Sequence, residues 1–145
     1  MWDIISGRGK GYAMSTLLNT NIYDYTRVLD KAADAAWIRN DCINNNLANV
    51  NTPGYKREDV DFKAQLKQAM REFRYMTTDQ KVASLKDEDL KPKSYIDHAG
   101  YSYRKDENNV DIDVENVYLA ENQMYYYGLT TSITTNFSDL KTVTK

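Results

Sequence analysis

Residues 47–57 read Leu-Ala-Asn-Val-Asn-Thr-Pro-Gly-Tyr-Lys-Arg, and they mark the point where a long helical pattern stops. Thr52 precedes Pro53, which disfavours the α conformation at Thr52. Gly54 readily adopts a positive φ, so Pro53 and Gly54 suit the second and third positions of a type II turn. The sequence therefore predicts a helix end followed by a tight turn, and we call residues 51–55 the elbow.

Apolar and small side chains recur every seven residues before the elbow. This row consists of Ile22, Leu29, Ala36, Ile43 and Val50. A companion row, four residues on, consists of Thr26, Ala33, Asn40 and Leu47. Positions three and four apart share one face of a helix. The pattern predicts one amphipathic helix over about 22–50.

A shorter helix is predicted after the elbow, over about 61–76, with Asp59 or Asp61 as its N-terminal cap. Its apolar positions have spacings of three and four: Phe62, Leu66, Ala69, Met70, Phe73 and Met76. The following residues, 77–108, are mostly polar and contain Pro92. We expect an insertion there, with at most a short extended pair around 93–103.

The seven-residue spacing returns near the C-terminus and predicts a helix over about 112–140, capped by Asp111 or Asp113. The main row consists of Ile112, Leu119, Tyr126, Ile133 and Leu140. The companion row consists of Asn116, Gln123, Thr130 and Phe137. We expect this helix to pair with 22–50, because a seven-residue repeat lets helices coil around one another.

The predicted fold is dominated by α-helix. Long N- and C-terminal helices form a coiled-coil inner domain, joined by a shorter third helix and a loop-rich or short-β middle insertion. We divide the chain into a flexible segment 1–21, the helix–elbow–helix unit 22–76, the variable insertion 77–108 and the C-terminal helix 109–145. The helical stripes are partly polar, and Trp37 and Tyr125 to Tyr127 have no evident partner in a monomer. Large exposed apolar areas mark contact sites, so we expect identical or homologous neighbours to complete the fold.

The composition excludes several classes of function. With 145 residues, the chain has the usual size of one domain. Its 19 basic and 21 acidic residues give a net charge of −2, too small a field to favour nucleic-acid binding. No apolar run approaches the ~20 residues that span a bilayer, and the N-terminus is a poor cleavable signal.

The sequence offers no catalytic, cofactor-binding or metal-binding constellation, so we expect no enzyme and no small-molecule substrate. One cysteine, Cys42, excludes an internal disulfide and a CxxC site. Cys42 and His98 are too few to suggest a nucleophile–base pair. The glycines between Gly7 and Gly11 lack the Gly-Lys-Ser/Thr ending of a phosphate loop.

Residues 47–57 resemble the signature of bacterial flagellar rod and hook proteins, in which an N-terminal helix ends in an Ala-Asn-x-x-Thr-Pro-Gly-Tyr-Lys turn. The matching residues here are Ala48, Asn49, Asn51, Thr52, Pro53, Gly54, Tyr55 and Lys56. The continuation through Asp61 and Phe62, and the C-terminal stretches 108–113, 120–122 and 137–140, resemble the proximal-rod subunits of that family. The resemblance covers roughly the first 62 and last 38 residues. Asn116, Gly128 and the threonine-rich 130–135 depart from the family pattern.

The resemblance implies a structural subunit of the proximal rod of the flagellar basal body. It implies export without signal cleavage through the flagellar type III apparatus and assembly in the periplasm. The implied partners are further copies of the chain, other rod subunits, a FliE-type junction protein and the inner-membrane ring. The alternatives are another rod subunit of the family, a cytoplasmic helical adaptor or export chaperone, and an enzyme built in 77–108.

Overall fold

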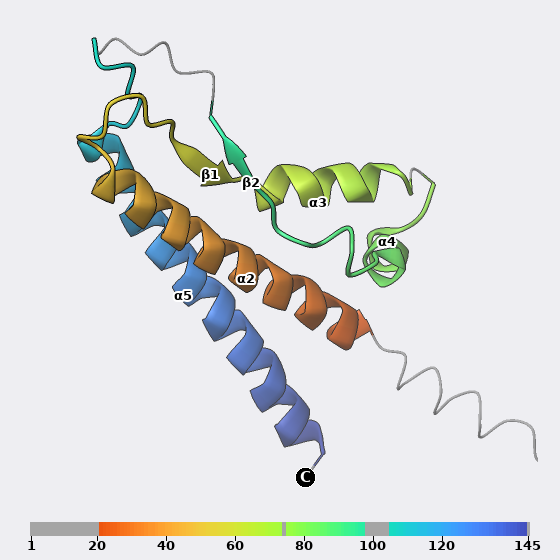
Figure 1. Ribbon diagram of the computed structural model, residues 1–145. Helices are drawn as coiled ribbons and strands as arrows, with labels where there is room; N and C mark the ends of the chain where they lie inside the picture. The colour runs from red at the N-terminus through yellow and green to blue at the C-terminus, as the bar shows by residue number, and fades with distance from the viewer. Residues whose placement is uncertain (1–20, 74, 98–104, 145) are drawn as a thin grey trace, which may run out of the picture.

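The computed structural model describes residues 21–73, 75–97 and 105–144. Two long helices, α2 (Asn21–Ala48) and α5 (Ile112–Val143), lie side by side near the elbow (Figure 1). The shorter helices α3 (Phe62–Arg71) and α4 (Thr78–Ser84) lie beyond α2 on the side away from α5. The strands β1 (Glu58–Val60) and β2 (Ser94–Ile96) lie between the elbow and α3. The predicted fold class is confirmed. The segment 1–20, residue His98 and the glycines 7–11 lie outside the described residues.

Helix α2 ends two residues earlier than the periodicity predicts, because its last turn tightens before the elbow. The Asn49 N–H donates to the carbonyls of both Asn45 and Asn46, at 3.1 and 3.2 Å. The Val50 N–H donates to the carbonyl of Leu47, three residues earlier, at 3.5 Å. Such short-range bonds are common where a helix terminates.

The middle of the chain is more ordered than the sequence indicates. The strands β1 and β2 pair antiparallel, with Glu58 opposite Ile96 and Val60 opposite Ser94. Strand β2 lies within 93–103, where at most a short extended pair was expected, but its partner is β1, which follows the elbow. Residues 98–103 lie outside the described part of the chain. Of the two predicted caps for α3, Asp61 is the one used, and that helix ends at Arg71 rather than near 76.

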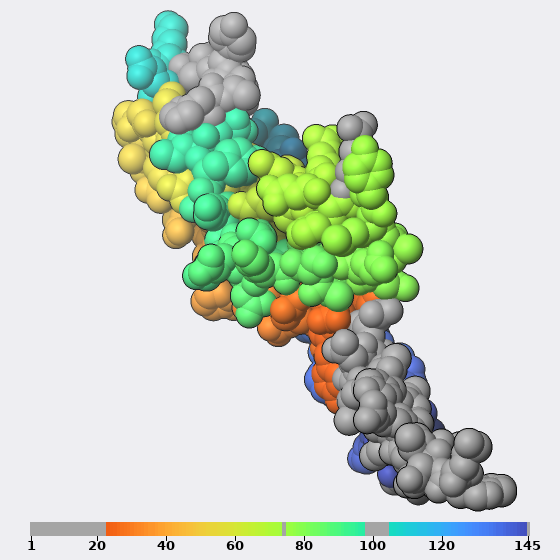
Figure 2. All heavy atoms as spheres, turned by 90° about the vertical axis from the view of Figure 1, so that its right-hand side faces the viewer, coloured from red at the N-terminus to blue at the C-terminus, as the bar shows by residue number. Residues whose placement is uncertain are grey.

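Helix α4 was not predicted, because its seven residues are too short to show a periodic pattern. It begins with a capping box in which the side chains of Thr77 and Gln80 each bond to the other's backbone N–H. Three apolar side chains in and after α4 are buried: Val82, Leu85 and Leu90. Residues 77–97 therefore contribute to the core. Figure 2 shows α3 and α4 as a yellow-green surface projecting beside α2.

Helix α5 begins at the cap Asp111, whose side chain accepts from the N–H groups of Asp113 and Val114. The buried residues of α5 keep the seven-residue spacing but are Glu115, Asn122 and Leu129. Each lies three residues after a member of the predicted main row. The seven-residue period is therefore correct, but the buried face of α5 is displaced from the predicted main row. The prediction followed apolar side chains, whereas two of the three buried side chains are polar.

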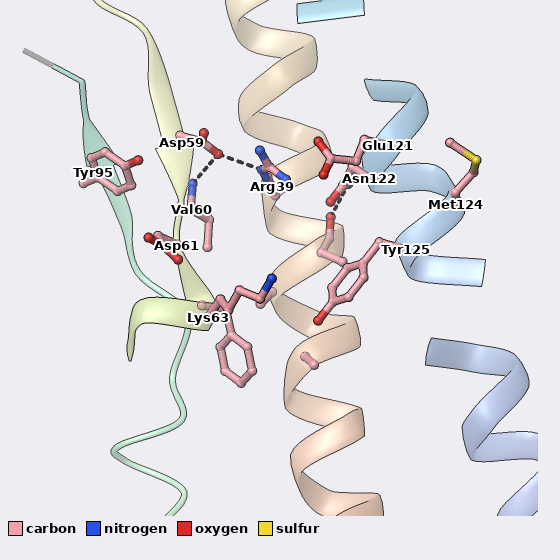
Figure 3. Close-up of a pocket in the computed structure, with 14 residues that line it drawn as sticks. Arg39, Asp59, Val60, Asp61, Lys63, Tyr95, Glu121, Asn122, Met124 and Tyr125 are labelled. Atoms are coloured by element: carbon pink, nitrogen blue, oxygen red, sulfur yellow. Dashed lines mark hydrogen bonds and ion pairs between the residues drawn. The ribbon is translucent and has the colours of Figure 1, made fainter. Parts of the chain in front are cut away.

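Asn122 lies between α2 and α5 and donates through Nδ2 to the carbonyl of Ala36 at 2.8 Å. Its Oδ1 atom is buried and has no hydrogen-bond partner among the described residues. Asn122 also lines a hollow of about 590 Å³, bounded by α2, β1, the start of α3, Tyr95 of β2 and α5 (Figure 3). The residues that line the hollow include Ala32 and Ala35 of α2. Their small side chains let the neighbouring elements approach α2 closely.

Most serine and threonine hydroxyls in the C-terminal half of α5 bond to the backbone of their own helix. Each donates to the carbonyl four residues earlier, at 2.8 to 3.1 Å, and the donors include Thr130, Ser132, Thr134, Thr135 and Thr142. This back-bonding satisfies the hydroxyls without a second helix. No helix in the described part of the chain is long and apolar enough to cross a membrane.

Candidate functional site

The elbow forms the predicted turn. The Tyr55 N–H donates to the carbonyl of Thr52 at 3.3 Å, which closes a four-residue turn around Pro53 and Gly54. Gly54 has a φ of +73°, so the predicted positive φ is confirmed. A Cβ built at Gly54 would meet no atom within 4 Å. Glycine is favoured there by backbone conformation, not by lack of space.

The segment that leads into α5 contacts the elbow directly. The Gly54 N–H donates to the carbonyl of Asp106 at 2.8 Å. The Lys56 Nζ donates to the carbonyl of Glu107 at 2.5 Å. Glu107 itself has a φ of +60°, which is uncommon for a residue with a side chain. The two chain segments are thus joined through backbone carbonyls as well as side chains.

Asn108 closes the C-terminal end of α2. Its side chain is 1% exposed, and Nδ2 lies 2.9 to 3.0 Å from the carbonyl oxygens of Asn49, Val50 and Thr52. Its Oδ1 accepts from the Val110 N–H at 2.8 Å. These three carbonyls follow the last residue of α2, Ala48. One amide from the start of the C-terminal segment therefore ties the helix end and the turn to the chain that leads into α5.

Asn46 connects α2 to β1 from a fully buried position. Its Oδ1 accepts from the Glu58 N–H at 2.9 Å, and its Nδ2 donates to the Glu58 carbonyl at 2.7 Å. The amide therefore satisfies both backbone groups of one strand residue. It also accepts from the Tyr55 hydroxyl at 3.3 Å and donates to Glu115 Oε2 at 3.2 Å.

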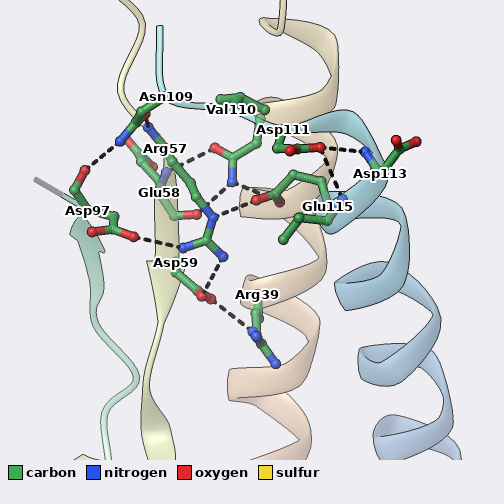
Figure 4. A network of polar contacts seen from close by, with 12 residues as sticks. Arg39, Arg57, Glu58, Asp59, Asp97, Asn109, Val110, Asp111, Asp113 and Glu115 are labelled. Atoms are coloured by element: carbon green, nitrogen blue, oxygen red, sulfur yellow. Dashed lines mark hydrogen bonds and ion pairs between the residues drawn. The ribbon is translucent and has the colours of Figure 1, made fainter. Parts of the chain in front are cut away.

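Arg57 lies at the centre of the site and bonds three carboxylates (Figure 4). Its nitrogens lie 2.5 Å from Glu115 Oε1, 2.8 Å from Asp59 Oδ2 and 3.3 Å from Asp97 Oδ2. The guanidinium also lies 5.1 Å from the centroid of the Tyr118 ring. Charge-assisted bonds of this kind are the strong ones, and the fork of Arg suits several acceptors at once.

A backbone bridge completes the arrangement. The Arg57 N–H donates to Asn109 Oδ1 at 2.8 Å, and Asn109 Nδ2 donates to the Asp97 carbonyl at 2.9 Å. The Asp97 N–H donates in turn to the Arg57 carbonyl at 2.8 Å. We call the joined set the elbow network; it consists of Asn46, Arg57, Asp59, Asp97, Asn108, Asn109 and Glu115. It joins α2, both strands and α5 at one end of the molecule.

The charges in the elbow network stabilise one another. Burial of the Asp59 carboxylate by itself raises its pKa, but hydrogen bonds from two arginines and from the Val60 N–H outweigh burial and lower the pKa. Burial of Arg57 opposes its charge, whereas its bonds to Glu115 and Asp59 raise its pKa overall. Both groups are therefore held in their charged forms, as a buried ion pair requires.

The site suits positioning better than acid–base chemistry. Burial, which is the main cause, raises the pKa of the Cys42 thiol, and a protonated thiol is a poor nucleophile. The described residues contain no group of three or more His, Cys, Asp or Glu side chains placed to hold a metal ion. What the network does is set the direction in which the chain leaves α2 and enters α5.

The predicted residues fall into three groups. The first group forms the helix end and the turn, in or against the network: Ala48, Asn49, Asn51, Thr52, Pro53, Gly54, Tyr55 and Lys56. After the turn, Asp61 caps α3 and Phe62 is buried. On α2, Ala36 and Ile43 are buried, Leu29 and Leu47 are half-buried, and Ile22 lies in the first turn; Val50, just after α2, is buried. On α5, Ile112, Tyr126 and Phe137 are exposed, and Leu119, Ile133 and Leu140 are half-buried.

Periodicity analysis missed the polar members of the network. Asn46, Arg57 and Glu115 are buried or half-buried polar residues, and a search for apolar rows passes over them. A signal was available, since Glu115 and Asn122 share the seven-residue spacing of Leu129. Asn108 and Asn109 belong to a stretch quoted for its resemblance, but nothing in their spacing indicates that they bond to the elbow.

Comparison with known proteins places the elbow in a family. Residues 27–56 match the family described as flagella basal body rod protein. The flagellar basal body rod protein FlgB of Bacillus subtilis (strain 168) is 36% identical over 115 residues, covering 79% of this chain and 88% of the relative. FlgB of Borreliella burgdorferi is 31% identical over 134 residues, covering 84% of this chain and 98% of the relative. FlgB of Proteus mirabilis is 30% identical over 121 residues, covering 72% and 82%.

The segment that matches the family includes the residues that form the elbow in the structure. The matched segment contains most of α2 and ends at Lys56, so it includes the whole elbow. The relatives extend the similarity over most of the chain. The chain therefore belongs to the FlgB family of flagellar basal body rod proteins.

Proposed function

We propose that this chain is a structural subunit of the bacterial flagellar basal-body rod and assembles through α2 and α5. One observation carries the proposal: both helices expose large apolar side chains that no other described part of the chain covers. The exposed set on α2 and α5 includes Trp37, Val117, Met124, Tyr125, Tyr126, Tyr127 and Phe137. Exposed apolar surface of this kind marks sites of protein contact.

The sequence of α5 supports the same conclusion. Residues 122–138 contain no charged side chain, although most of them are exposed. A helix that faces water on most sides normally carries charged residues on its polar face. Tyrosine is common at protein interfaces because it buries a large area while keeping a polar tip. Residues 122–138 therefore have the surface of a helix surrounded by other helices.

The finer assignment rests on the resemblance. We place the subunit in the proximal rod, in the periplasm, exported without signal cleavage by the flagellar type III apparatus. There it contacts other rod subunits, a FliE-type junction protein and the inner-membrane ring, and helps to transmit torque. The segments 1–21, 22–76, 77–108 and 109–145 act as separate parts in this assembly, and the chain is not an enzyme.

Two experiments test the proposal. Purified basal bodies from cells that carry an epitope-tagged chain should contain the tag. Recovery of the chain only in the cytoplasm would instead support the adaptor or chaperone alternative. Secondly, Tyr127→Cys should form cross-links in basal bodies, because Tyr127 is 74% exposed and the native Cys42 is buried. The matched control is Lys91→Cys, which is exposed but lies outside both long helices.

A further inference from the structure

A groove with basic walls runs along α3 and has a volume of about 780 Å³. Lys63, Lys67 and Arg71 are four residues apart and line one side of it, with Lys81 of α4 as a further cation. Leu66 and Met70 contribute apolar surface and are half-buried. We call these six residues the basic groove. None of its four cations has an ion-pair partner among the described residues.

A complementary surface lies on α2 of the same chain. Asp30, Asp34, Trp37 and Asp41 have spacings of four, three and four residues, which place them along one side of the helix. We call them the acidic ridge. All four are exposed, and Trp37 is 60% exposed. Asp34 has only a neighbouring contact, to Lys31 at 3.3 Å, of the exposed type that contributes little.

The ridge and the groove of one chain cannot meet each other. The ridge faces away from the buried residues of α2, among them Ala32, Ala36 and Ile43. Helix α3 packs on that buried side through Leu66 and Met70, which contact the core cluster. The two surfaces therefore point to different sides of α2, and no described part of the chain covers the ridge or fills the groove.

We propose that the acidic ridge of one copy docks in the basic groove of the next copy. The spacings agree, since four residues of helix rise about 6 Å both from Asp30 to Asp34 and from Lys63 to Lys67. Trp37 then lies over Leu66 and Met70, with carboxylates on both sides of it to pair with the lysines and Arg71. Tryptophan buried in an apolar pocket among charges is typical of an interface anchor.

This contact joins two different surfaces, so it is heterologous and can continue from copy to copy. The inference rests on the proposed function, because a rod subunit must contact its neighbours. It goes further by naming which surface of the chain meets which. A second copy is favoured over a lipid surface because the complementary acidic partner is already present on α2, and its central tryptophan matches the apolar floor.

Charge reversal in the purified full-length chain tests the docking. The groove variant is Lys67→Glu with Arg71→Glu, and the ridge variant is Asp34→Lys with Asp41→Lys. We expect the unchanged chain to self-associate at low salt in analytical ultracentrifugation, and less at high salt. Each variant alone should associate at least about tenfold more weakly. An equimolar mixture of the two should regain association, because each contact between unlike variants then joins an acidic surface to a basic one.

The control carries Lys86→Glu and Lys91→Glu, two exposed reversals outside the groove, and should associate like the unchanged chain. Circular dichroism checks that every variant keeps its helices. A monomeric unchanged chain, variants with unaltered association, or a mixture without rescue would each overturn the proposal. So would groove-dependent binding to phosphatidylglycerol vesicles with unaltered self-association. If the docking test fails, the assignment of the chain to the rod is still tested by the basal-body fractionation, which does not depend on this contact.

Discussion

The two ends of the α2–α5 pair are built differently. At the elbow end, the two helices are joined by a network whose members include the fully buried Asn46 and the 1% exposed Glu115 and Asn108. At the far end, which consists of residues 21–30 of α2 and 130–143 of α5, no described side chain is buried. The helices lie together at the elbow and diverge toward the C-terminus of α5 (Figure 1).

The difference separates internal structure from assembly. The elbow end satisfies its polar groups within the chain and so sets its own geometry. The far end satisfies most of its hydroxyls but leaves apolar side chains such as Phe137, 55% exposed, without partners among the described residues. We interpret the elbow end as the part that is stabilised by contacts within the chain. We interpret the far end as the part that is completed by contacts with neighbouring subunits.

The largest effect should follow from Arg57→Ala. This change leaves the buried Glu115 carboxylate without its counter-charge and leaves Asp59 paired with Arg39 alone. Breaking a buried pair costs about 3–5 kcal/mol. Urea unfolding followed by circular dichroism measures the loss. Arg71→Ala, at an exposed cation of α3, is the matched control and should change the free energy of unfolding by less than about 0.5 kcal/mol. Equal losses for the two variants would remove the distinction between the elbow network and an ordinary surface.

A smaller loss is expected for Asn108→Ala. Three backbone carbonyls just after α2, those of Asn49, Val50 and Thr52, then lose a shared donor. The Asn49 and Thr52 carbonyls keep bonds from the N–H groups of Thr52 and Tyr55, and losing the buried side-chain bonds costs about 1–3 kcal/mol. Hydrogen exchange of the elbow amides should speed up, while exchange in the middle of α2 stays slow. Asn116→Ala, an exposed amide on α5, is the control. Unchanged exchange at the elbow in the Asn108 variant would contradict the capping role.

Gly54→Val tests whether the direction of the elbow matters to assembly. A β-branched residue at a φ of +73° is strained by about 1–3 kcal/mol. We expect motility to fall more than the helicity of the purified chain. Gly54→Asn is the control, because Asn tolerates positive φ better. Normal motility in the valine variant would show that the elbow is an ordinary turn.

The smallest effect on the isolated chain should come from the far end. Phe137→Ser removes an exposed ring, so the free energy of unfolding should change by less than about 0.5 kcal/mol. Motility and recovery of the chain in basal bodies should nevertheless fall, because the ring is lost from the assembled state. If unfolding and motility were both unaffected, the far end would not be an assembly surface.

The sequence predicted the long elements and the turn for physical reasons that act locally. A seven-residue repeat identifies a helix wherever it persists, and a Thr-Pro-Gly run restricts backbone dihedrals whatever surrounds it. Helix α4 and the pairing of β1 with β2 depend instead on short segments whose order comes from distant contacts. Thr77 and Gln80 form a capping box, but a polar stretch of seven residues gives no periodic pattern to place it in.

The candidate site could be predicted only in part. Residues 51–55 were recognised because they restrict the backbone. The residues that hold them in place are Asn46, Asn108 and Glu115, which are polar and buried. Each of these is buried because other parts of the chain supply its hydrogen-bond partners. No local rule indicates that Arg57 will meet a carboxylate 58 positions later. Such pairings come from tertiary structure, and they displaced the buried face of α5 from the apolar row expected there.

The back-bonded threonines of α5 have a consequence for a protein that must exist in two environments. Thr130, Thr134 and Thr135 direct their hydroxyl hydrogens to carbonyls one turn earlier in the same helix. A newly made subunit surrounded by water and the same subunit enclosed by neighbours can therefore keep identical hydrogen bonds along this stretch. None of these three hydroxyl groups loses its hydrogen-bond acceptor when the subunit moves from water into the assembly. The threonine methyl groups remain able to pack against neighbours.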